Sequence, residues 1–125
     1  MRVEGTFNFQ KLEVWQEAIR FADDVYGVTK HFPKDERFGL VNQMRRAAVS
    51  ISSNLAEGAS RHSKVDFARF VEIAVGSTFE VVSQAHIARA QDYLGEEDFR
   101  KLCEHADKIS RMCSGLRKSL KSNNG

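Results

Sequence analysis

The sequence has little of what interrupts helices, cross-links a chain or anchors it in a membrane. It contains one proline and two cysteines among 125 residues. Cys103 and Cys113 fall on one predicted helix, about 15 Å apart at a rise of ~1.5 Å per residue. A disulfide needs Cα atoms within about 7 Å, so we interpret both as packing residues. No apolar run approaches the roughly 18 residues that span a bilayer. The first residues lack the apolar core of a signal peptide, and we expect a cytoplasmic protein with no membrane partner.

The sequence also lacks the spacings that mark common catalytic and metal sites. Its four histidines show no HExxH spacing and stand in no cluster of metal ligands. Each glycine stands alone, so there is no Gly-rich phosphate loop, and no GxSxG motif is present. We therefore expect a protein that is not an enzyme and takes no cofactor, metal or small-molecule substrate. An enzyme would need a pocket lined by Glu57, Glu72 or His86.

Apolar residues spaced three and four apart run along four segments of the chain. This spacing predicts helices at about 9–29, 36–57, 63–94 and 96–120. The periodic residues are Leu12, Trp15, Ile19, Ala22 and Tyr26 in the first helix, and Val41, Met44, Ala48, Ile51 and Leu55 in the second. Gly58 is expected to end the second helix. Short connections imply antiparallel neighbours, so we predict an all-α fold, an antiparallel up-down four-helix bundle, as a single domain over 1–125.

The segment 63–94 is apolar around most of its circumference. A narrow polar stripe runs through Arg69, Glu72, Gly76, Glu80 and Ser83. A four-helix bundle buries only one stripe of each helix, so Val75 and Phe79, at the edges of the polar stripe, would be exposed in a lone bundle. This excess of apolar surface predicts a homo-oligomer.

The outer face of the second helix carries small polar residues where Lys and Glu are usual. Serine and asparagine intrinsically disfavour helices, yet Ser50 to Asn54 contains four of them. Two interpretations stay open. A water-facing serine costs little, or small side chains let another helix or subunit approach closely. The candidate subunit contacts are Ser50, Ser53, Asn54, Val75, Phe79 and Val82.

The charge balance alone does not establish a nucleic-acid partner, because 19 basic residues stand against 17 acidic ones. Clustering is more informative, since grouped Lys and Arg release counterions from phosphate. The candidate nucleic-acid contacts are Arg45, Arg46, Arg61 and Lys64, with Arg117 and Lys118 at the basic end of the fourth helix.

An internal ion pair is the alternative role for some of these charges. If the second and third helices are antiparallel around residue 60, Arg45 and Arg46 lie level with Ala74 and Val75. Glu72 would then lie within about one turn of both arginines, and we expect it to pair with one of them.

Four stretches of the chain are similar to a known family. FNFQKLEVWQEA, HFPKDERFGLVNQMRRAAVSI, SNLAEG and FVEIAVGSTFEV resemble the four-helix-bundle family of 23S rRNA intervening-sequence proteins, also labelled "S23 ribosomal protein". The resemblance covers about 9–93 and fades in the fourth helix. It implies a bundle that assembles into a ring-shaped homo-oligomer, with a pentamer favoured. A similar pentameric barrel is the accessory protein of diversity-generating retroelements, where it contacts a reverse transcriptase and nucleic acid.

That resemblance implies a role linked to RNA or to a nucleic-acid-processing protein. The first hypothesis is therefore a non-enzymatic, oligomeric RNA- or nucleoprotein-binding module. The alternative is a protein-protein interaction scaffold that binds no nucleic acid. The chain departs from many relatives at Ser52, where they carry proline, so we expect any kink in the second helix to be weaker or absent.

Overall fold

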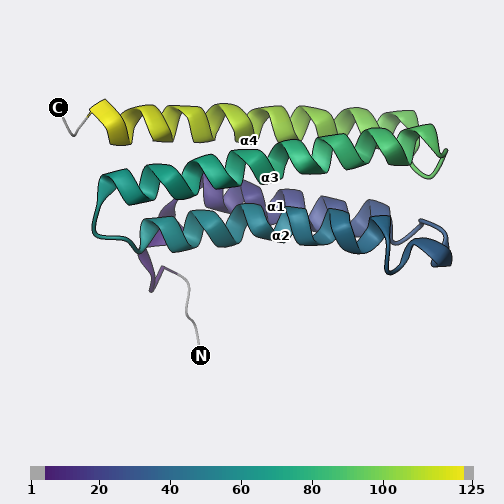
Figure 1. Cartoon of the computed structure of the whole chain (residues 1–125), viewed down its shortest axis with the longest axis horizontal. Coiled ribbons are helices and arrows are strands. Elements are labelled where there is room, and N and C mark those ends of the chain that lie inside the picture. The colour runs from purple at the N-terminus through teal and green to yellow at the C-terminus, as the bar shows by residue number, and fades with distance from the viewer. Residues whose placement is uncertain (1–4, 123–125) are drawn as a thin grey trace.

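The computed structural model describes residues 5–122, which form four long helices in an up-down bundle (Figure 1). The helices are α1 (Glu13–Thr29), α2 (Leu40–Ala59), α3 (Lys64–Ala90) and α4 (Glu96–Ser122), with two short 3-10 helices, η1 (Asn8–Lys11) and η2 (Lys34–Glu36). The predicted all-α four-helix bundle is confirmed. Residues 1–4 and 123–125 of the predicted domain lie outside the described part of the chain.

The two ends of the bundle are formed by different connections and helix termini. The α2–α3 connection lies at one end with the start of α1 and the last turns of α4 (Figure 1). We call this the α2–α3 end. The α1–α2 and α3–α4 connections lie at the other end, which we call the α1–α2 end. Contacts join α1 to α2, α2 to α3, α3 to α4 and α4 back to α1, so the helices stand at the corners of a square.

Three helix boundaries differ from those expected, each for a local reason. The first helix is interrupted at Leu12, whose extended backbone separates η1 from α1. The second begins at Leu40, whose backbone N–H donates to Oε1 of Glu36 at 3.0 Å. The third ends at Ala90, and Asp92 adopts a left-handed backbone with φ of 61°. Asp tolerates that conformation better than most residues, so the chain turns there before α4.

The predicted core is confirmed for the second helix and only in part for the first. All five periodic residues of the second helix are buried. In α1 the buried apolar residues are Val14, Ala18, Phe21 and Val25. Three residues of the predicted stripe, Leu12, Trp15 and Ala22, pack partly against this core, whereas Ile19 and Tyr26 are exposed. Each fully buried large apolar side chain contributes about 1.5–3 kcal/mol. Cys113 is also buried, as its packing role requires, and this burial raises the pKa of its thiol to about 11.

Small residues bring α2 and α3 close together. Gly58 lies inside α2 rather than ending it, and a Cβ there would stand 2.7 Å from Cβ of Phe70 and 3.0 Å from Cδ1 of Phe67. Farther along, the hydroxyls of Ser50 and Ser77 are 2.9 Å apart. The helix that the small side chains of α2 admit is therefore α3 of the same chain.

The Ser50–Ser77 contact also fixes the register of α2 against α3. Arg45, five residues before Ser50, lies opposite Val82, five residues after Ser77, because the helices are antiparallel. Glu72 is consequently remote from Arg45 and Arg46. It accepts instead from Nε of Arg117 on α4, at 2.5 Å. The expected pairing of Glu72 with Arg45 or Arg46 is therefore wrong.

Ser52 does not interrupt α2. The helix continues through it from Leu40 to Ala59. The side chain is buried, and its hydroxyl donates to the backbone oxygen of Val49 at 3.1 Å. A serine here keeps the backbone N–H that proline would remove.

Replacing Gly58 with alanine should destabilise the bundle. The added methyl group would overlap Phe70, and overpacking of a core costs about 1–3 kcal/mol. That cost should exceed the ~1 kcal/mol by which alanine is favoured over glycine in a helix. Thermal unfolding followed by circular dichroism measures the difference. Gly115→Ala is the matched control, because its added Cβ would meet nothing within 4 Å apart from its chain neighbours and the backbone of its own helix, and it should stabilise α4. Equal effects of the two substitutions would contradict this account of Gly58.

Candidate nucleic-acid interface and subunit contacts

The structure divides the six candidate nucleic-acid contacts into two groups. Arg61 and Lys64 flank the α2–α3 connection, and Arg117 and Lys118 lie in the last turns of α4, so these four share the α2–α3 end. The pair Arg45 and Arg46 lies in the first half of α2. Sixteen residues separate Arg45 from Arg61, which is roughly 24 Å along a helix axis. The sequence clusters therefore do not form one continuous patch.

At the α2–α3 end, two of the four candidate cations form ion pairs and the other two have no partner among residues 5–122. Arg61 donates to Oε2 of Glu57 at 2.6 Å and lies over the ring of Phe70, 4.8 Å from its centroid. Arg117 is paired with Glu72 as described above. Among residues 5–122, Lys64 and Lys118 have no ion-pair or hydrogen-bond partner, and both are exposed. These two lysines are available to an anionic ligand without breaking an existing contact.

The two arginines of α2 also differ from each other. Nε of Arg45 donates to the hydroxyl of Thr29 at 2.9 Å, and the guanidinium lies over Tyr26, 4.5 Å from the ring centroid. Arg45 therefore ties α2 to α1. Arg46 is exposed and has no partner in the described part of the chain.

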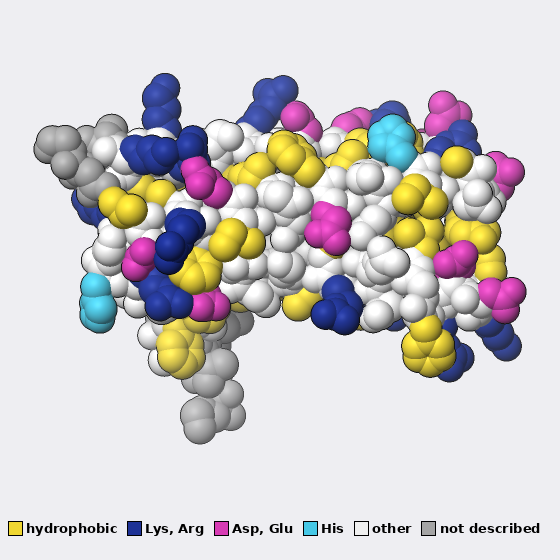
Figure 2. Space-filling model, viewed as in Figure 1, with side chains coloured by type: hydrophobic (Ala, Val, Ile, Leu, Met, Phe, Trp, Pro, Cys, Tyr) yellow, Lys and Arg dark blue, Asp and Glu magenta, His cyan; other side chains and the backbone are white. Residues whose placement is uncertain are grey.

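Charge is sorted along the bundle. The first turn of α4 carries Glu96, Glu97 and Asp98, whereas its last turns carry Lys118 and Lys121. Figure 2 shows Lys and Arg side chains gathered over the α2–α3 end, at the left of the view, with a few Asp and Glu side chains among them. The α2–α3 end is thus the basic end of the molecule.

The candidate subunit contacts have different surroundings. Phe79 is 59% exposed, as the apolar pattern of the third helix predicts, whereas Val75 and Val82 pack partly against the core. Ser53 is exposed. Ser50 and Asn54 are engaged within the subunit, since Nδ2 of Asn54 donates to the backbone oxygen of Ser50 at 2.8 Å. These two residues support the α2–α3 contact.

The sequence reading missed one exposed apolar surface. Ile19, Tyr26 and Val49 are 44%, 39% and 42% exposed and lie on the side formed by α1 and α2. Ile19 and Tyr26 were expected in the core. A signal was present in the sequence, because α1 carries a second apolar stripe with the same spacing, through Val14, Ala18, Phe21 and Val25.

Comparison with known families identifies this arrangement. The sequence pattern of the 23S rRNA-intervening sequence proteins matches residues 10–115. The chain belongs to this family. The match continues into α4, beyond the point where the individual motifs fade. The family name assigns no catalytic activity.

A solved structure of an S23 ribosomal protein family member shares the fold. It is a protein of unknown function from Bacteroides thetaiotaomicron, 19% identical to this chain with a TM-score of 0.75. The alignment covers 84% of this chain and 98% of the other. No curated protein sequence matches the chain.

Within residues 5–122, no three His, Cys, Asp or Glu side chains converge as a metal site would require. Glu72 and His86 are 14 residues apart on α3, or about 21 Å, so one pocket cannot use both. Across the same residues, no helix is long and apolar enough to cross a bilayer.

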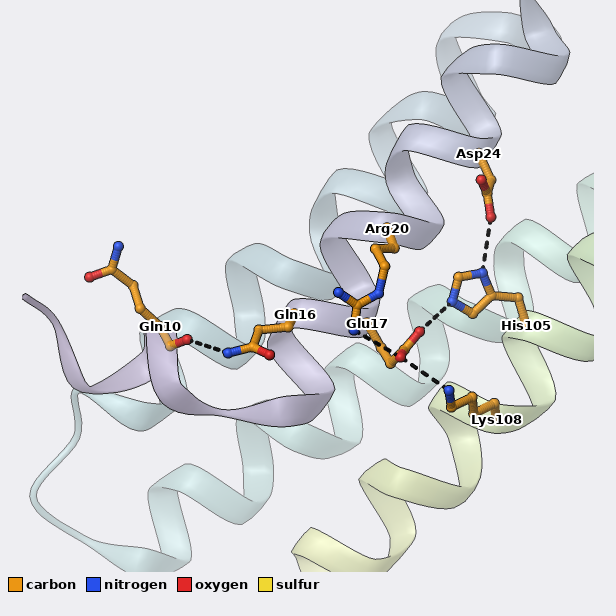
Figure 3. A network of polar contacts seen from close by, with 7 residues as sticks. All are labelled: Gln10, Gln16, Glu17, Arg20, Asp24, His105 and Lys108. Atoms are coloured by element: carbon orange, nitrogen blue, oxygen red, sulfur yellow. Dashed lines mark hydrogen bonds and ion pairs between the residues drawn. The ribbon is translucent and has the colours of Figure 1, made fainter. Parts of the chain in front are cut away.

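A polar cluster joins α1 to α4 in this family member (Figure 3). The carboxylate of Glu17 lies 3.0 Å from Arg20, 2.9 Å from Nε2 of His105 and 3.1 Å from Lys108. Nδ1 of His105 lies 3.0 Å from Asp24. Hydrogen bonds from Arg20, then His105 and Lys108, lower the pKa of Glu17 from 4.5 to about 2. The cluster holds α1 and α4 together by charge-assisted contacts.

Acid should weaken the bundle through Glu17. Its pKa is depressed in the folded state, so its contribution to stability is complete above about pH 4.5 and is lost as the pH falls towards 2. Glu17→Gln should make the stability depend less on pH. It should also lower the free energy of unfolding by about 1–3 kcal/mol at neutral pH, because hydrogen bonds to a charged group are lost. Denaturant unfolding across this pH range measures both effects. Asp24→Asn, which loses a single contact at a more exposed carboxylate, should have the smaller effect.

Proposed function

We propose that this chain is a non-enzymatic, homo-oligomeric protein that associates with RNA through the α2–α3 end of its bundle. The observation that supports this proposal is the group of cations at that end, with Lys64 and Lys118 unpaired among the described residues. Each lysine that neutralises a phosphate releases counterions, which is a favourable and sequence-independent contribution to binding. The family membership agrees with an RNA-linked role.

Arg61 and Arg117, which already form ion pairs, would contribute to RNA binding differently from the two lysines. Glu57 and Glu72 already neutralise Arg61 and Arg117, so a phosphate gains less from them than from a free lysine. Their fixed guanidinium groups can still donate hydrogen bonds with the N–H groups that the carboxylates leave unused. We therefore expect the lysines to supply most of the salt-dependent affinity and the arginines to position the RNA backbone.

Self-association would strengthen a weak site of this kind. One bundle offers few phosphate contacts, but several bundles in a ring, with a pentamer favoured, would offer several copies of the same end. Linked sites bind a long RNA with an avidity above that of each single site, because the later contacts form intramolecularly. An oligomer and an RNA partner are therefore parts of one proposal.

Removing the free lysines should weaken RNA binding in a salt-dependent way. The double substitution Lys64→Ala and Lys118→Ala should lower affinity several-fold and reduce the slope of log K against log salt by about 1 for each lysine. Fluorescence anisotropy with a labelled structured RNA, over a series of salt concentrations, measures both. Lys34→Ala with Lys101→Ala is the control, since these exposed lysines lie at the α1–α2 end.

The alternative function is a protein-protein interaction scaffold. Phe38, between η2 and α2, is 86% exposed, which is unusual for an aromatic side chain and suits a protein contact. A protein that stays oligomeric after nuclease treatment and binds no RNA at physiological salt would refute the RNA proposal and favour the scaffold.

A further inference from the structure

A hollow at the α1–α2 end of the bundle is lined by four cations. It lies between the last turn of α1, the loop that carries η2 and the first turns of α2, and its volume is about 270 Å³. The cations are Lys30, Lys34, Arg37 and Arg45, and no acidic residue stands among the described residues that line the hollow. The hollow therefore concentrates positive charge, which attracts anions. It is remote from the α2–α3 end, which lies at the other end of the bundle (Figure 1).

The four cations of the hollow have no carboxylate partner. None of them forms an ion pair within residues 5–122. The two acidic residues of the η2 loop, Asp35 and Glu36, do not line the hollow. Both carboxylate oxygens of Glu36 are engaged elsewhere, since Oε1 accepts from the backbone N–H of Leu40 at 3.0 Å and Oε2 accepts from the hydroxyl of Tyr93 at 3.2 Å. No ion pair in the described part of the chain therefore neutralises the charge of the hollow.

The end of α1 accounts for two of these cations but not for the other two. Lys30 directly follows the last residue of α1, where a cation complements the helix dipole. Arg45 donates from Nη2 to the backbone oxygen of Tyr26 at 3.4 Å, in the last turn of the same helix. Lys34 and Arg37 belong to the η2 loop, and their side chains make no hydrogen bond within residues 5–122. Helix stability therefore does not explain why they stand beside the first two cations.

The loop that carries Lys34 and Arg37 is fixed to the bundle on both sides of η2. Before η2, Phe32 is buried, and its ring centroid lies 5.6 Å from that of Tyr93. At the last residue of η2, the two hydrogen bonds of Glu36 connect the loop to α2 and to Tyr93. A loop anchored in this way keeps its cations close together without a ligand. An anion that binds there would have to order little of the chain, which lowers the entropic cost of binding.

An exposed aromatic ring stands beside the hollow. Phe38 follows Arg37 in the chain and is almost fully exposed. The guanidinium carbon of Arg37, which lines the hollow, lies 5.8 Å from the centroid of the Phe38 ring. So exposed a ring gains little from packing within the bundle, and it offers a flat apolar face to a ligand that occupies the hollow.

We propose that this hollow binds the phosphate groups of a free nucleotide, such as a nucleoside diphosphate, while the base stacks on Phe38. A diphosphate carries several negative charges, so it matches four cations better than a single carboxylate does. Pockets that enclose a whole drug-sized ligand measure roughly 300–1,000 Å³, so this smaller hollow would hold the phosphates and leave the base outside. Every base has a flat face that can stack on an aromatic ring, and we expect little preference among bases. The site is independent of the proposed RNA contacts at the α2–α3 end.

Isothermal titration calorimetry at low salt and without divalent cations tests the phosphate contacts. ADP should bind, whereas adenosine, which has no phosphate, should not. The double substitution Lys34→Ala and Arg37→Ala should weaken ADP binding at least tenfold. Both side chains are exposed, so the fold should be kept, and circular dichroism checks this. Arg46→Ala with Lys101→Ala is the control, because it removes the same charge from exposed positions outside the lining of the hollow and should leave ADP binding unchanged.

A substitution of Phe38 tests the stacking of the base separately. Phe38→Ala should weaken the binding of ADP several-fold and leave the binding of pyrophosphate, which has no base, unchanged. Phe38→Tyr keeps a flat ring and should bind ADP as the unchanged protein does. An equal loss of ADP and pyrophosphate binding in Phe38→Ala would contradict the stacking role of this ring.

Three outcomes would overturn the inference. ADP that fails to bind at millimolar concentration would exclude a nucleotide site. Equal losses in the two double variants would mean that ADP responds only to the net charge of the protein. An RNA with a 5′-hydroxyl end that displaces ADP from the unchanged protein, and that binds more weakly to the Lys34→Ala and Arg37→Ala variant, would make the hollow part of an RNA surface.

The same proteins separate this inference from the RNA proposal. If ADP binds as described but the unchanged protein binds no RNA, the nucleotide site stands and the RNA proposal is wrong. If RNA binds through Lys64 and Lys118 but ADP does not bind, the RNA proposal stands and this inference fails.

Discussion

The close contact between α2 and α3 determines where every other part of the molecule lies. Gly58 lets the aromatic rings of α3 approach the backbone of α2, and the Ser50–Ser77 hydrogen bond fixes how far the two helices overlap. A slip of one turn would move each residue of α3 by about 5.4 Å against α2. It would separate Val49 from the height of Phe79. The small residues of α2 therefore set the register of α2 against α3, and this register decides which side chains of the two helices lie level with each other.

The sequence predicts the four helices but not every buried face. The second helix has one apolar stripe, and all five residues predicted from it are buried. The first helix has two stripes of equal spacing, so periodicity cannot choose between them. The structure buries the stripe that contains Phe21 and leaves Ile19 and Tyr26 at the surface. The choice depends on how α1 packs against α2 and α4, which the sequence of α1 does not contain.

The cluster of cations at the α2–α3 end could also be predicted only in part, because it too depends on contacts between helices. Proximity in sequence and in an antiparallel hairpin places Arg61 near Lys64. Whether a cation is free depends on partners from other helices. Arg45 contacts Tyr26 and Thr29 of α1. The register predicted by counting residues from the α2–α3 turn also placed Arg45 opposite the wrong residues of α3. Charge in a sequence identifies candidates, and tertiary contacts decide which remain available.

Helix stability explains some of the charge sorting but not all of it. Acidic residues in the first turn of α4 and basic residues in its last turn both complement the helix dipole, so Lys118 and Lys121 need no ligand to account for them. Lys64 is different. It is the first residue of α3, where the positive end of the dipole disfavours a cation and favours an anion. Asp66 supplies one negative charge in that turn, but Asp66 is itself paired with Arg69. An exposed lysine at a helix start, beside other cations, leaves positive potential that the bundle does not neutralise, and an RNA phosphate would neutralise it.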